Sequence, residues 1–417
     1  MIGAIMIEAP SDFCPGILHA VPAKDGLLMR LRLPGGQLPA ATLAAIADLA
    51  RRHGDGALDL TARANIQLRG IRPGALVPLV EGLRRAGLLP SEAHERIRNI
   101  LVSPFAGVDP TELLDLRRLA QDLDGALIAD PDLARLPAKF AFTLDGGGRG
   151  FDPGGGDLTL TAVPTAAGPR LHLSLSGRPT GRGTALDGAA ALLIRACGAL
   201  LALAAKHDLP ARGRAILATT VAYDEFLRNL PTEPCPMPPH RATTARFGRW
   251  DEINPQHATL LPSIPLGRLT AAEAIRWADL ANRFDIDMRL TPWRNLALCR
   301  VERTDIPALG LVLDGSDGFT GLAACAGSEG CAQAFADVRA DAKTFADRVA
   351  GALPPAGWAI HFAGCAKRCA LRGGAKVDLI ATQNGYDVLF DGRRAHIGLS
   401  AEQALAAART AYPTKAP

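Results

Sequence analysis

Two pairs of cysteines late in the sequence have the residue type and the spacing to bind a metal. Five residues separate Cys325 from Cys331, and three separate Cys365 from Cys369. Thiols clustered in this way in an intracellular protein usually hold a metal, because nothing there keeps disulfides oxidised. Structural zinc sites usually place about two to four residues between paired ligands, whereas a [4Fe–4S] cluster takes one thiolate at each corner iron. The spacing therefore favours the cluster, with zinc as the second interpretation and ordinary buried cysteines as the third.

The composition is typical of a globular protein and argues against two classes of partner. The chain has 417 residues, of which 48% are apolar and 21% charged, and this predicts two or three domains. Arg195 interrupts the longest apolar run, 189–205, which favours a buried amphipathic helix over a membrane span. The first residues lack a basic segment, so no signal peptide is expected. A net charge of +4 and few aromatic residues disfavour a nucleic-acid surface, and we expect a cytoplasmic protein.

An internal duplication organises the sequence. Residues 33–68 align with residues 264–298 when a single gap is placed at Gly54, and the matches include Leu60, Thr61 and Asn65. Each copy has the pattern of a strand, a glycine turn, a helix and a strand. Two copies so far apart predict two homologous halves related by pseudo-two-fold symmetry, with a site where they meet.

The segments between the copies complete the expected domain plan. A longer α/β stretch follows each copy, at 91–230 and 306–410, and the proline-dense segment 231–239 is expected to be the linker because proline cannot continue a helix or central strand. We therefore predict a mixed α+β (α/β) fold. Its expected units are 1–90, 91–230, 231–305 and 306–417, the last carrying the four cysteines.

Arginines recur at positions that predict a polar surface. Alternation in 27–33 puts Arg30 and Arg32 on one face of a strand. We expect 60–69 to be a second such strand, and a third polar cluster lies at 96–99. Any one of these arginines could be an ordinary solvent-facing residue, but together they favour a site for an extended polyanion such as a carboxylated tetrapyrrole. In the second copy Trp293 replaces Arg63 and Ala297 replaces Gln67, so one half is expected to bind and the other to support.

These segments resemble the siroheme-dependent sulfite and nitrite reductase superfamily. Residues 60–71 resemble its LT-x-RQ-x-x-Q-x-HG segment, although Ala64 stands in place of the glutamine. Arg98, Asn99 and the following Ser103-Pro104 resemble its RN-x-x-x-SP block, and the cysteine spacing resembles its cluster signature. The resemblance covers essentially the whole chain. It implies a duplicated architecture of two ferredoxin-like half-domains and two larger α/β domains.

Within the superfamily the chain resembles the precorrin-3B synthases, through Cys14-Pro15-Gly16 and the segment 26–33. That resemblance implies a dioxygen-dependent monooxygenase that hydroxylates precorrin-3A at C20, with lactone formation, in aerobic cobalamin biosynthesis. The reductases carry two lysines in an L-P-x-K-x-K pattern, whereas this chain keeps Lys139 and has Ala141 at the second position. Losing one cation suits a neutral oxidant better than nitrite or sulfite, whose oxygens must be protonated.

Roles for individual residues follow from this resemblance. It implies that Cys325, Cys331, Cys365 and Cys369 ligate a [4Fe–4S] cluster and that Lys139 and Arg98 are catalytic. The residues expected to bind the macrocycle are Arg30, Arg32, Arg63, Asn65, Gln67, Arg69 and Asn99.

The resemblance also implies cofactors and partners. The family description includes a non-haem iron, but no His/His/carboxylate triad stands out in the sequence. Because a dinucleotide fingerprint is missing, NADH is expected to be the ultimate donor only through an external reductase or ferredoxin. Two alternatives stay open: a siroheme-dependent assimilatory sulfite or nitrite reductase, and a non-catalytic tetrapyrrole-binding or electron-carrier iron–sulfur protein. A zinc-stabilised binding module is a more distant alternative.

Overall fold

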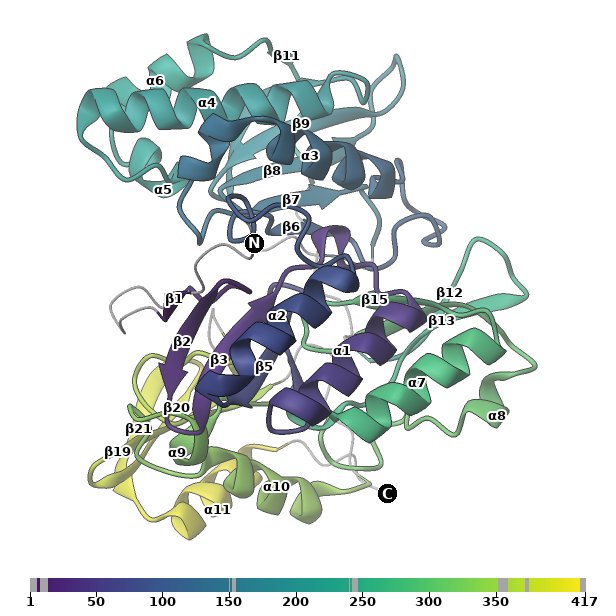
Figure 1. Ribbon diagram of the computed structural model, residues 1–417, viewed down its shortest axis with the longest axis vertical. Helices are drawn as coiled ribbons and strands as arrows, with labels where there is room; N and C mark the ends of the chain where they lie inside the picture. The colour runs from purple at the N-terminus through teal and green to yellow at the C-terminus, as the bar shows by residue number, and fades with distance from the viewer. Residues whose placement is uncertain are drawn as a thin grey trace.

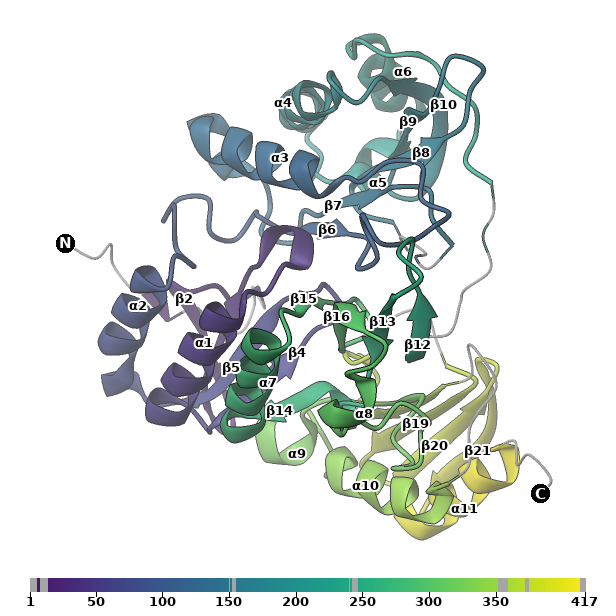
Figure 2. The ribbon, with the colours of Figure 1, turned by 90° about the vertical axis from the view of Figure 1, so that its right-hand side faces the viewer.

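The chain forms four β-sheets with helices packed against them (Figure 1). The computed structural model describes residues 6–7, 14–149, 151, 155–239, 241, 247–351, 359–371 and 375–412. Both views place an α/β domain at one end, the two half-domains in the middle and a second α/β domain at the other end (Figure 2). The mixed α/β class predicted from the sequence is confirmed.

The first half-domain is a sheet covered by two helices. Its β-strands are β1 (Met6–Ile7), β2 (His19–Ala23), β3 (Gly26–Leu31), β4 (Ala57–Leu60) and β5 (Ile66–Ile71). Its helices are α1 (Ala40–His53) and α2 (Leu76–Arg85), and short 3-10 turns lie at η1 (Pro34–Gly36) and η2 (Pro73–Ala75). In α1 the buried residues Leu43, Ile46, Ala47 and Ala50 recur at the helical period, so one face packs on the sheet.

The second half-domain repeats this plan with a smaller sheet. Its β-strands are β12 (Gly248–Asp251), β13 (His257–Leu261), β14 (Arg268–Thr270), β15 (Asp287–Leu290) and β16 (Leu296–Glu302). Its helices are η4 (Pro265–Gly267), α7 (Ala271–Arg283) and α8 (Ile306–Leu309). Thr270 begins α7 with a capping box, in which its hydroxyl accepts from the Glu273 amide while the Glu273 carboxylate accepts from the Thr270 amide.

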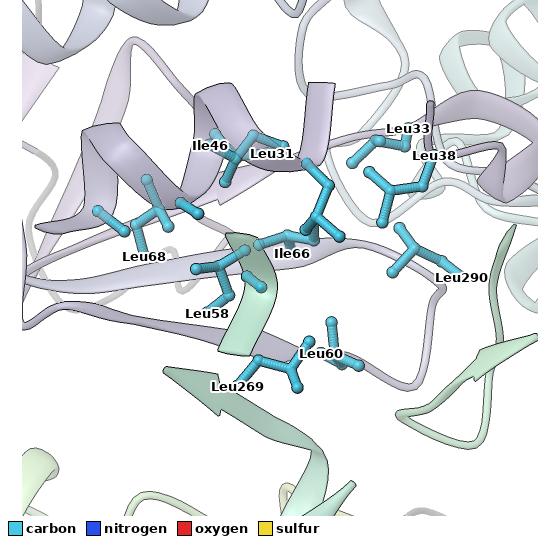
Figure 3. Close-up of a cluster of buried hydrophobic side chains, with 14 of the residues drawn as sticks. Leu31, Leu33, Leu38, Ile46, Leu58, Leu60, Ile66, Leu68, Leu269 and Leu290 are labelled. Carbon is cyan, nitrogen blue, oxygen red and sulfur yellow. The ribbon is translucent and has the colours of Figure 1, made fainter. Parts of the chain in front are cut away.

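Each half-domain pairs the same short segment with a strand of the other half-domain. β14 pairs with β4, so that Arg268 lies opposite Asp59, and Gln37 forms an isolated bridge with Arg289. In the sequence alignment Gln37 is equivalent to Arg268, and Asp59 to Arg289. Each copy therefore contributes the same segment to the other, as expected for a pseudo-two-fold axis. Figure 3 shows the result, because Leu269 and Leu290 of the second copy lie among leucines of the first in one shared core.

The expected single strand over 60–69 is wrong. Leu60 and Ile66 pair directly across a hairpin, and the residues between them form its turn. The Thr61 hydroxyl accepts from the Asn65 amide at 3.1 Å, and Ala64 has a left-handed φ of 51°. The hydroxyl of Thr61 therefore supplies a local turn that the alternating pattern concealed. Arg63 lies in the turn, away from the face that carries Gln67 and Arg69.

The first α/β domain is a six-stranded sheet with the order β11-β10-β9-β8-β7-β6. Its β-strands are β6 (Ile100–Val102), β7 (Phe142–Asp145), β8 (Leu158–Val163), β9 (Arg170–Leu175), β10 (Arg178–Thr184) and β11 (Glu233–Pro234). Its helices are α3 (Arg117–Ala129), η3 (Pro131–Arg135), α4 (Ala189–His207), α5 (Gly213–Leu217) and α6 (Thr220–Arg228). The predicted linker at 231–239 contributes only β11, a two-residue edge strand on β10.

Helix α4 is, among the described residues, the one helix long and apolar enough to cross a membrane by length and composition alone. Its residues Leu192, Leu193, Ala196 and Leu200 are buried in the core that the helix shares with β6–β9. The predicted amphipathic helix over 189–205 is therefore present, and its apolar side packs within the domain.

The second α/β domain is a five-stranded sheet with the order β17-β18-β19-β20-β21. Its β-strands are β17 (Leu322–Ala324), β18 (Ile360–Ala363), β19 (Val377–Thr382), β20 (Gly385–Phe390) and β21 (Arg393–Leu399). Its helices are α9 (Gly327–Gly330), α10 (Val338–Val349) and α11 (Ala401–Ala411). The first three strands are parallel and the last two antiparallel. The boundaries expected from the sequence stay a prediction.

Candidate functional site

A hydrogen-bond network centred on Asn99 joins the first half-domain to the first α/β domain. The Asn99 Oδ1 atom accepts from the Arg32 Nε atom at 3.0 Å and from the Asn65 Nδ2 atom at 3.4 Å. Its Nδ2 atom donates to the carbonyls of Phe140 at 2.9 Å and Ala138 at 3.3 Å. Asn99 is only 4% exposed, so losing these partners would leave buried polar atoms unpaired. Three residues predicted to bind the macrocycle, Arg32, Asn65 and Asn99, are therefore brought together.

The same network fixes the backbone on both sides of Lys139. The Ala138 carbonyl also accepts from the Cys14 Sγ atom at 3.1 Å, while the Phe140 amide donates to the Pro137 carbonyl at 2.7 Å. The Lys139 side chain itself is exposed. A mobile lysine on a fixed backbone can present its charge to a ligand at a defined position.

Arg32 lies among charges of both signs. Burial lowers the pKa of its guanidinium, Cys14 and Glu95 oppose this effect, and the neighbouring cations Arg63 and Arg96 lower the pKa further. Arg32 is 2% exposed, so its charge has little access to water. Guanidinium groups gathered in this way are suited to bind a carboxylate.

A second pair of predicted binding residues lies on neighbouring strands. Arg30 on β3 lies opposite Gln67 on β5, and its Nη2 atom donates to the Gln67 Oε1 atom at 2.6 Å. Arg69, two residues along β5, instead donates to both carboxylate oxygens of Asp25, at 2.8 and 3.0 Å, and to the Gly330 carbonyl. Arg69 therefore links the half-domain to the cysteine region rather than facing the Asn99 network.

Arg98, predicted to be catalytic, makes a bidentate ion pair. Its Nε and Nη2 atoms each lie 2.7 Å from an oxygen of Asp124 on α3, and its side chain is 7% exposed. In this fork-to-fork geometry two N–H groups of Arg98 each donate to one oxygen of the carboxylate. The described contacts of Arg98 are thus those of a residue that attaches α3 to the strand edge.

Two residues at this site have roles that the sequence did not reveal. The buried Glu95 carboxylate accepts from the amides of Ile17 and Leu18, at 2.7 and 3.2 Å, and lies 2.7 Å from the His19 Nδ1 atom. A Cβ atom on Gly16 would lie 2.1 Å from a Glu95 oxygen. Glycine is therefore required after Cys14 and Pro15, and Glu95 holds the segment that places the Cys14 thiol beside Arg32. Only the long-range contacts show this arrangement.

The four candidate cluster ligands lie in two loops at the same edge of a sheet. Cys325 follows β17, and Cys365 follows β18, which is parallel to β17 and pairs Ala324 with Phe362. The Gly364 amide donates to the Cys325 Sγ atom at 3.2 Å, so the two loops are in contact. Parallel strands end together at one edge, and this is why residues distant in sequence meet here.

The remaining two cysteines lie on the same loops. Cys331 closes α9, and the loop after it returns to the strand end, where the Phe335 amide donates to the Gly364 carbonyl at 2.9 Å. Cys369 follows a tight turn in which Arg368 has a φ of 46° and its amide donates to the Cys365 carbonyl. All four thiols are free of disulfides, with three half-buried and Cys369 exposed.

The described residues do not form a single-ion metal site. Across the described ranges, no three His, Cys, Asp or Glu residues form a group that could hold a metal ion. A [4Fe–4S] cluster would instead take one thiolate at each of four irons. The amide donated to the Cys325 Sγ atom would stabilise a thiolate, and a Cβ atom on Gly364 would lie 3.3 Å from that sulfur.

Comparison with known proteins gives the same assignment for the half-domains. The family model described as the nitrite/sulfite reductase ferredoxin-like half domain matches residues 19–86 and again residues 254–310. The chain carries this half domain twice. The resemblance to the sulfite and nitrite reductase superfamily is thereby confirmed, as is the duplicated architecture.

Two curated relatives cover most of the chain. A precorrin-3B synthase from Sinorhizobium sp is 28% identical over 395 residues, covering 91% of this chain and 82% of the relative. A ferredoxin–nitrite reductase from Synechococcus elongatus is 28% identical over 429 residues, covering 90% of this chain and 83% of the relative. The identities are equal, so they support the superfamily more than either reaction.

A solved structure shares the whole fold. The structure of the Mycobacterium tuberculosis NirA protein aligns with a TM-score of 0.73 at 22% identity, covering 90% of this chain and 78% of that one. At this identity the likeness concerns the fold alone. The nitrite/sulfite reductase half domains thus supply the frame, and the function must be argued from the side chains.

The two half domains differ at the site in the direction that the sequence suggested. Trp293, which replaces Arg63, packs its ring 6.0 Å from the ring of Phe105, and Trp250 lies 5.1 Å from the same ring. Ala297, which replaces Gln67, is buried in the same small cluster. The first half domain therefore presents polar groups where the second builds an apolar contact with the first α/β domain.

Proposed function

We propose that the chain is an oxidoreductase that binds a carboxylated tetrapyrrole at the Asn99 network. The carrying observation is the convergence of Arg32, Asn65 and Asn99 with the fixed Lys139 loop, close to the cations Arg63 and Arg96. Guanidinium groups suit carboxylates because they donate in a planar fork and stay charged when partly buried. The curated relatives, a precorrin-3B synthase and ferredoxin–nitrite reductases, support an oxidoreductase.

The proposed reaction is that of a precorrin-3B synthase: dioxygen-dependent hydroxylation of precorrin-3A at C20, with lactone formation, in aerobic cobalamin biosynthesis. Support comes from the precorrin-3B synthase relative and from Ala141, which stands where the reductase pattern has a second lysine. The Ala141 amide donates to the Asp157 Oδ2 atom at 3.1 Å, so this backbone is fixed by Asp157 and carries no second cation. A neutral oxidant does not need that charge.

In this proposal each group of residues has a separate task. Arg32, with Arg63 and Arg30 nearby, binds carboxylates of the macrocycle, while Asn65 and Asn99 hold Arg32 in position. Lys139 presents its ammonium group toward the bound macrocycle from a backbone that Cys14 and Asn99 fix. Cys325, Cys331, Cys365 and Cys369 would hold a [4Fe–4S] cluster, which supplies electrons one at a time when bound.

Electrons must come from outside the chain in this scheme. NADH is the proposed ultimate donor, acting through an external reductase or ferredoxin, because the sequence lacks a dinucleotide fingerprint. If the purified protein alone oxidises NADH in step with product formation, the need for a partner is disproved.

A siroheme-dependent sulfite or nitrite reductase is the second candidate. The observation that favours it is the equal identity to a ferredoxin–nitrite reductase, together with the retained Lys139. In that case the tetrapyrrole would be a resident cofactor rather than a substrate.

One preparation separates the two candidates. Protein purified without oxygen should show a broad brown absorption, about four irons and matching sulfide per chain, and no sharp haem bands. It should then transfer an atom from isotopically labelled dioxygen to precorrin-3A when a reductase is supplied. Sharp siroheme bands with nitrite or sulfite turnover would instead establish the reductase. Tight precorrin binding without dioxygen consumption would indicate a carrier.

A further inference from the structure

Two arginines, one from each half domain, hold the peptide units that precede the first two candidate ligands. Arg294 donates from its Nη1 atom to the Ala324 carbonyl at 2.8 Å, next to Cys325. Arg69 donates from its Nη2 atom to the Gly330 carbonyl, next to Cys331. Each contact joins a half domain to the second α/β domain, so the loop carrying both cysteines is fixed from outside its own domain.

Arg69 makes a close contact with the Gly330 carbonyl, and the Asp25 carboxylate compensates its positive charge. Asp25 accepts from two nitrogens of Arg69, so the guanidinium reaches Gly330 as one member of an ion pair. A Cβ atom on Gly330 would lie 2.8 Å from the Arg69 Nη2 atom and 3.0 Å from an Asp25 oxygen. The peptide at Gly330 is therefore seated against this pair, and the role of Arg69 is to position the loop.

Arg294 differs from Arg69 because its partners are neutral. Its three nitrogens donate to the carbonyls of Leu60 at 3.0 Å, Ala324 at 2.8 Å and Leu266 at 2.9 Å. Within the described part of the chain, no carboxylate forms an ion pair with Arg294. Asp59 also interacts electrostatically with Arg294, but its carboxylate is already paired with Arg268 and Arg339. The buried charge of Arg294 thus remains beside Cys325, with which it interacts electrostatically.

We propose that Arg294 is a positioning residue that also raises the reduction potential of the cluster, and that Arg69 positions the same loop without doing so. This inference rests on the proposed ligation of a cluster by the four cysteines. Reduction adds an electron to a centre that four thiolates already make negative, so a nearby fixed cation stabilises the reduced form. The difference between the two arginines follows from Asp25, which neutralises one of them.

The first α/β domain supplies a matched control. Arg289 donates from its Nη1 atom to the carbonyls of Pro104 at 3.0 Å and Ala106 at 2.6 Å, in the loop that follows β6. This is the same kind of carbonyl contact, made by a buried arginine of the second half domain on a loop without candidate ligands, although Arg289 also pairs with Asp287. Arg289→Gln therefore measures what losing such contacts, together with that ion pair, does away from the cysteine loops.

The test compares the wild-type protein with Arg294→Gln, Arg294→Lys, Arg69→Gln and Arg289→Gln. Iron and sulfide content, visible absorption and thermal unfolding are measured on each, and the midpoint potential is measured by reductive titration followed by electron paramagnetic resonance. We expect Arg294→Gln to shift the midpoint to a more negative value, with Arg294→Lys in between because it keeps the charge but loses two of three carbonyl contacts. Arg69→Gln should lower cluster content with little shift in the potential of the remaining cluster.

The outcomes separate this inference from the function on which it rests. A wild-type protein without iron and sulfide would overturn the cluster assignment and the inference with it. A wild-type protein that holds the cluster, with Arg294→Gln at the same potential, would overturn the inference alone. Equal shifts in Arg294→Gln and Arg289→Gln would also overturn it, because the effect would then reflect general loosening of the structure. If Arg294→Gln fails to fold, the comparison of Arg294→Lys with Arg289→Gln decides.

Discussion

The two α/β domains share one topology but use the same sheet edge for different purposes. β6, β7 and β8 are parallel with Ile100, Phe142 and Leu158 in register, and β17, β18 and β19 are parallel with Leu322, Ile360 and Val377 in register. In both domains two antiparallel strands follow, and the first domain adds the two-residue edge strand β11. The register aligns Ser103 with Cys325, and Gly147 with Cys365. The fold thus provides two equivalent edges, of which one carries the candidate cluster ligands.

The residue before the first strand shows how equivalent backbones acquire different functions. The Asn99 carbonyl accepts from the Phe142 amide at 2.8 Å, and the equivalent Gly321 carbonyl accepts from the Ile360 amide at 2.9 Å. Only Asn99 has a side chain that can reach Arg32. A polar network therefore forms at the first domain, while the second has a glycine at the same point and the candidate ligands in the loop that follows.

The strand interiors differ as well. His361 and Asp378 lie on adjacent strands of the second domain, with the His361 Nδ1 atom 3.1 Å from an Asp378 oxygen, and both are fully buried. The equivalent positions in the first domain are Thr143 and Thr159. Arg368, between two candidate ligands, lies 3.3 Å from the other Asp378 oxygen. The contacts of Asp378 with His361 and Arg368 thus belong to the cysteine edge, whereas the first domain has threonines at the two equivalent strand positions.

The largest expected effect comes from changing a cysteine at that edge. Cys325→Ser should abolish the iron and sulfide of the purified protein, because an alcohol at this position replaces a thiolate ligand. Ser103→Ala at the equivalent position of the first domain should leave both unchanged. Iron and sulfide analysis of the two variants checks this. If Cys325→Ser keeps about the wild-type content, the proposed ligand set is incorrect.

Asn99→Ala should have the next largest effect, and it makes the first domain resemble the second. Removing the amide leaves the Arg32 Nε atom and the Phe140 carbonyl without this partner, while the Ala138 carbonyl keeps the Cys14 thiol, and the expected cost is about 1–3 kcal/mol in the free energy of unfolding. Binding of a carboxylated tetrapyrrole should weaken at least about tenfold, the equivalent of about 1.4 kcal/mol.

Denaturant unfolding and fluorescence titration measure the two effects of Asn99→Ala separately. Asn295→Ala, at the position of the second half domain that aligns with Asn65, is the control for binding, because the Asn295 Oδ1 atom accepts only from the Leu296 amide among its described hydrogen bonds. Equal binding by Asn99→Ala and the wild type would show that the network is purely structural.

The sequence predicted the architecture around this site better than the side-chain contacts within it. The duplication, the cysteine loops and the convergence of Arg32, Asn65 and Asn99 follow from patterns that are local or repeated. The hairpin turn at 61–65 was missed because alternation of polar and apolar residues continues through it. The contact of Arg69 with the Gly330 carbonyl spans 261 residues, so nothing local could indicate it. The likeness of the two α/β domains was predicted only through the duplication of the half-domains, since it lies in strand order and register rather than in residue identity.

Changing Arg98 tests whether the first strand of each α/β domain is held in a different way. Its equivalent in the second domain is Thr320, so the ion pair with Asp124 belongs to the first domain alone. Arg98→Ala should lower the free energy of unfolding by about 1–3 kcal/mol, because the partly buried Asp124 carboxylate loses its partner.

The double variant tests whether the role of Arg98 is structural. Arg98→Ala with Asp124→Ala should lose less stability than the sum of the single variants, as denaturant unfolding of all four proteins would show. Turnover per folded molecule should then change little. A large loss of turnover in Arg98→Ala, without loss of stability, would instead restore the catalytic role that the resemblance implied.

The smallest expected effect concerns an acidic group beside the edge of the first domain. Burial raises the pKa of Glu112 to about 8, and the nearby Asp115 and Asp109 add to this, although the Gly107 amide donates to its carboxylate at 2.5 Å. Because the folded pKa lies above the unfolded value of 4.5, the folded state binds the extra proton between these values. Ionisation of Glu112 therefore makes the fold less stable as the pH rises through that window.

Glu112→Gln should remove this dependence while keeping an oxygen for the Gly107 amide. Measured by denaturant unfolding, the variant should match the wild type at about pH 5 and exceed it at about pH 8. Asp314, an exposed acid near the second domain whose pKa is lowered by hydrogen bonds from Ser316, gives the control, because Asp314→Asn should not gain stability toward high pH. Parallel pH profiles for Glu112→Gln and the wild type would show that water reaches Glu112 freely. Burial at the first edge could then not account for the raised pKa of Glu112.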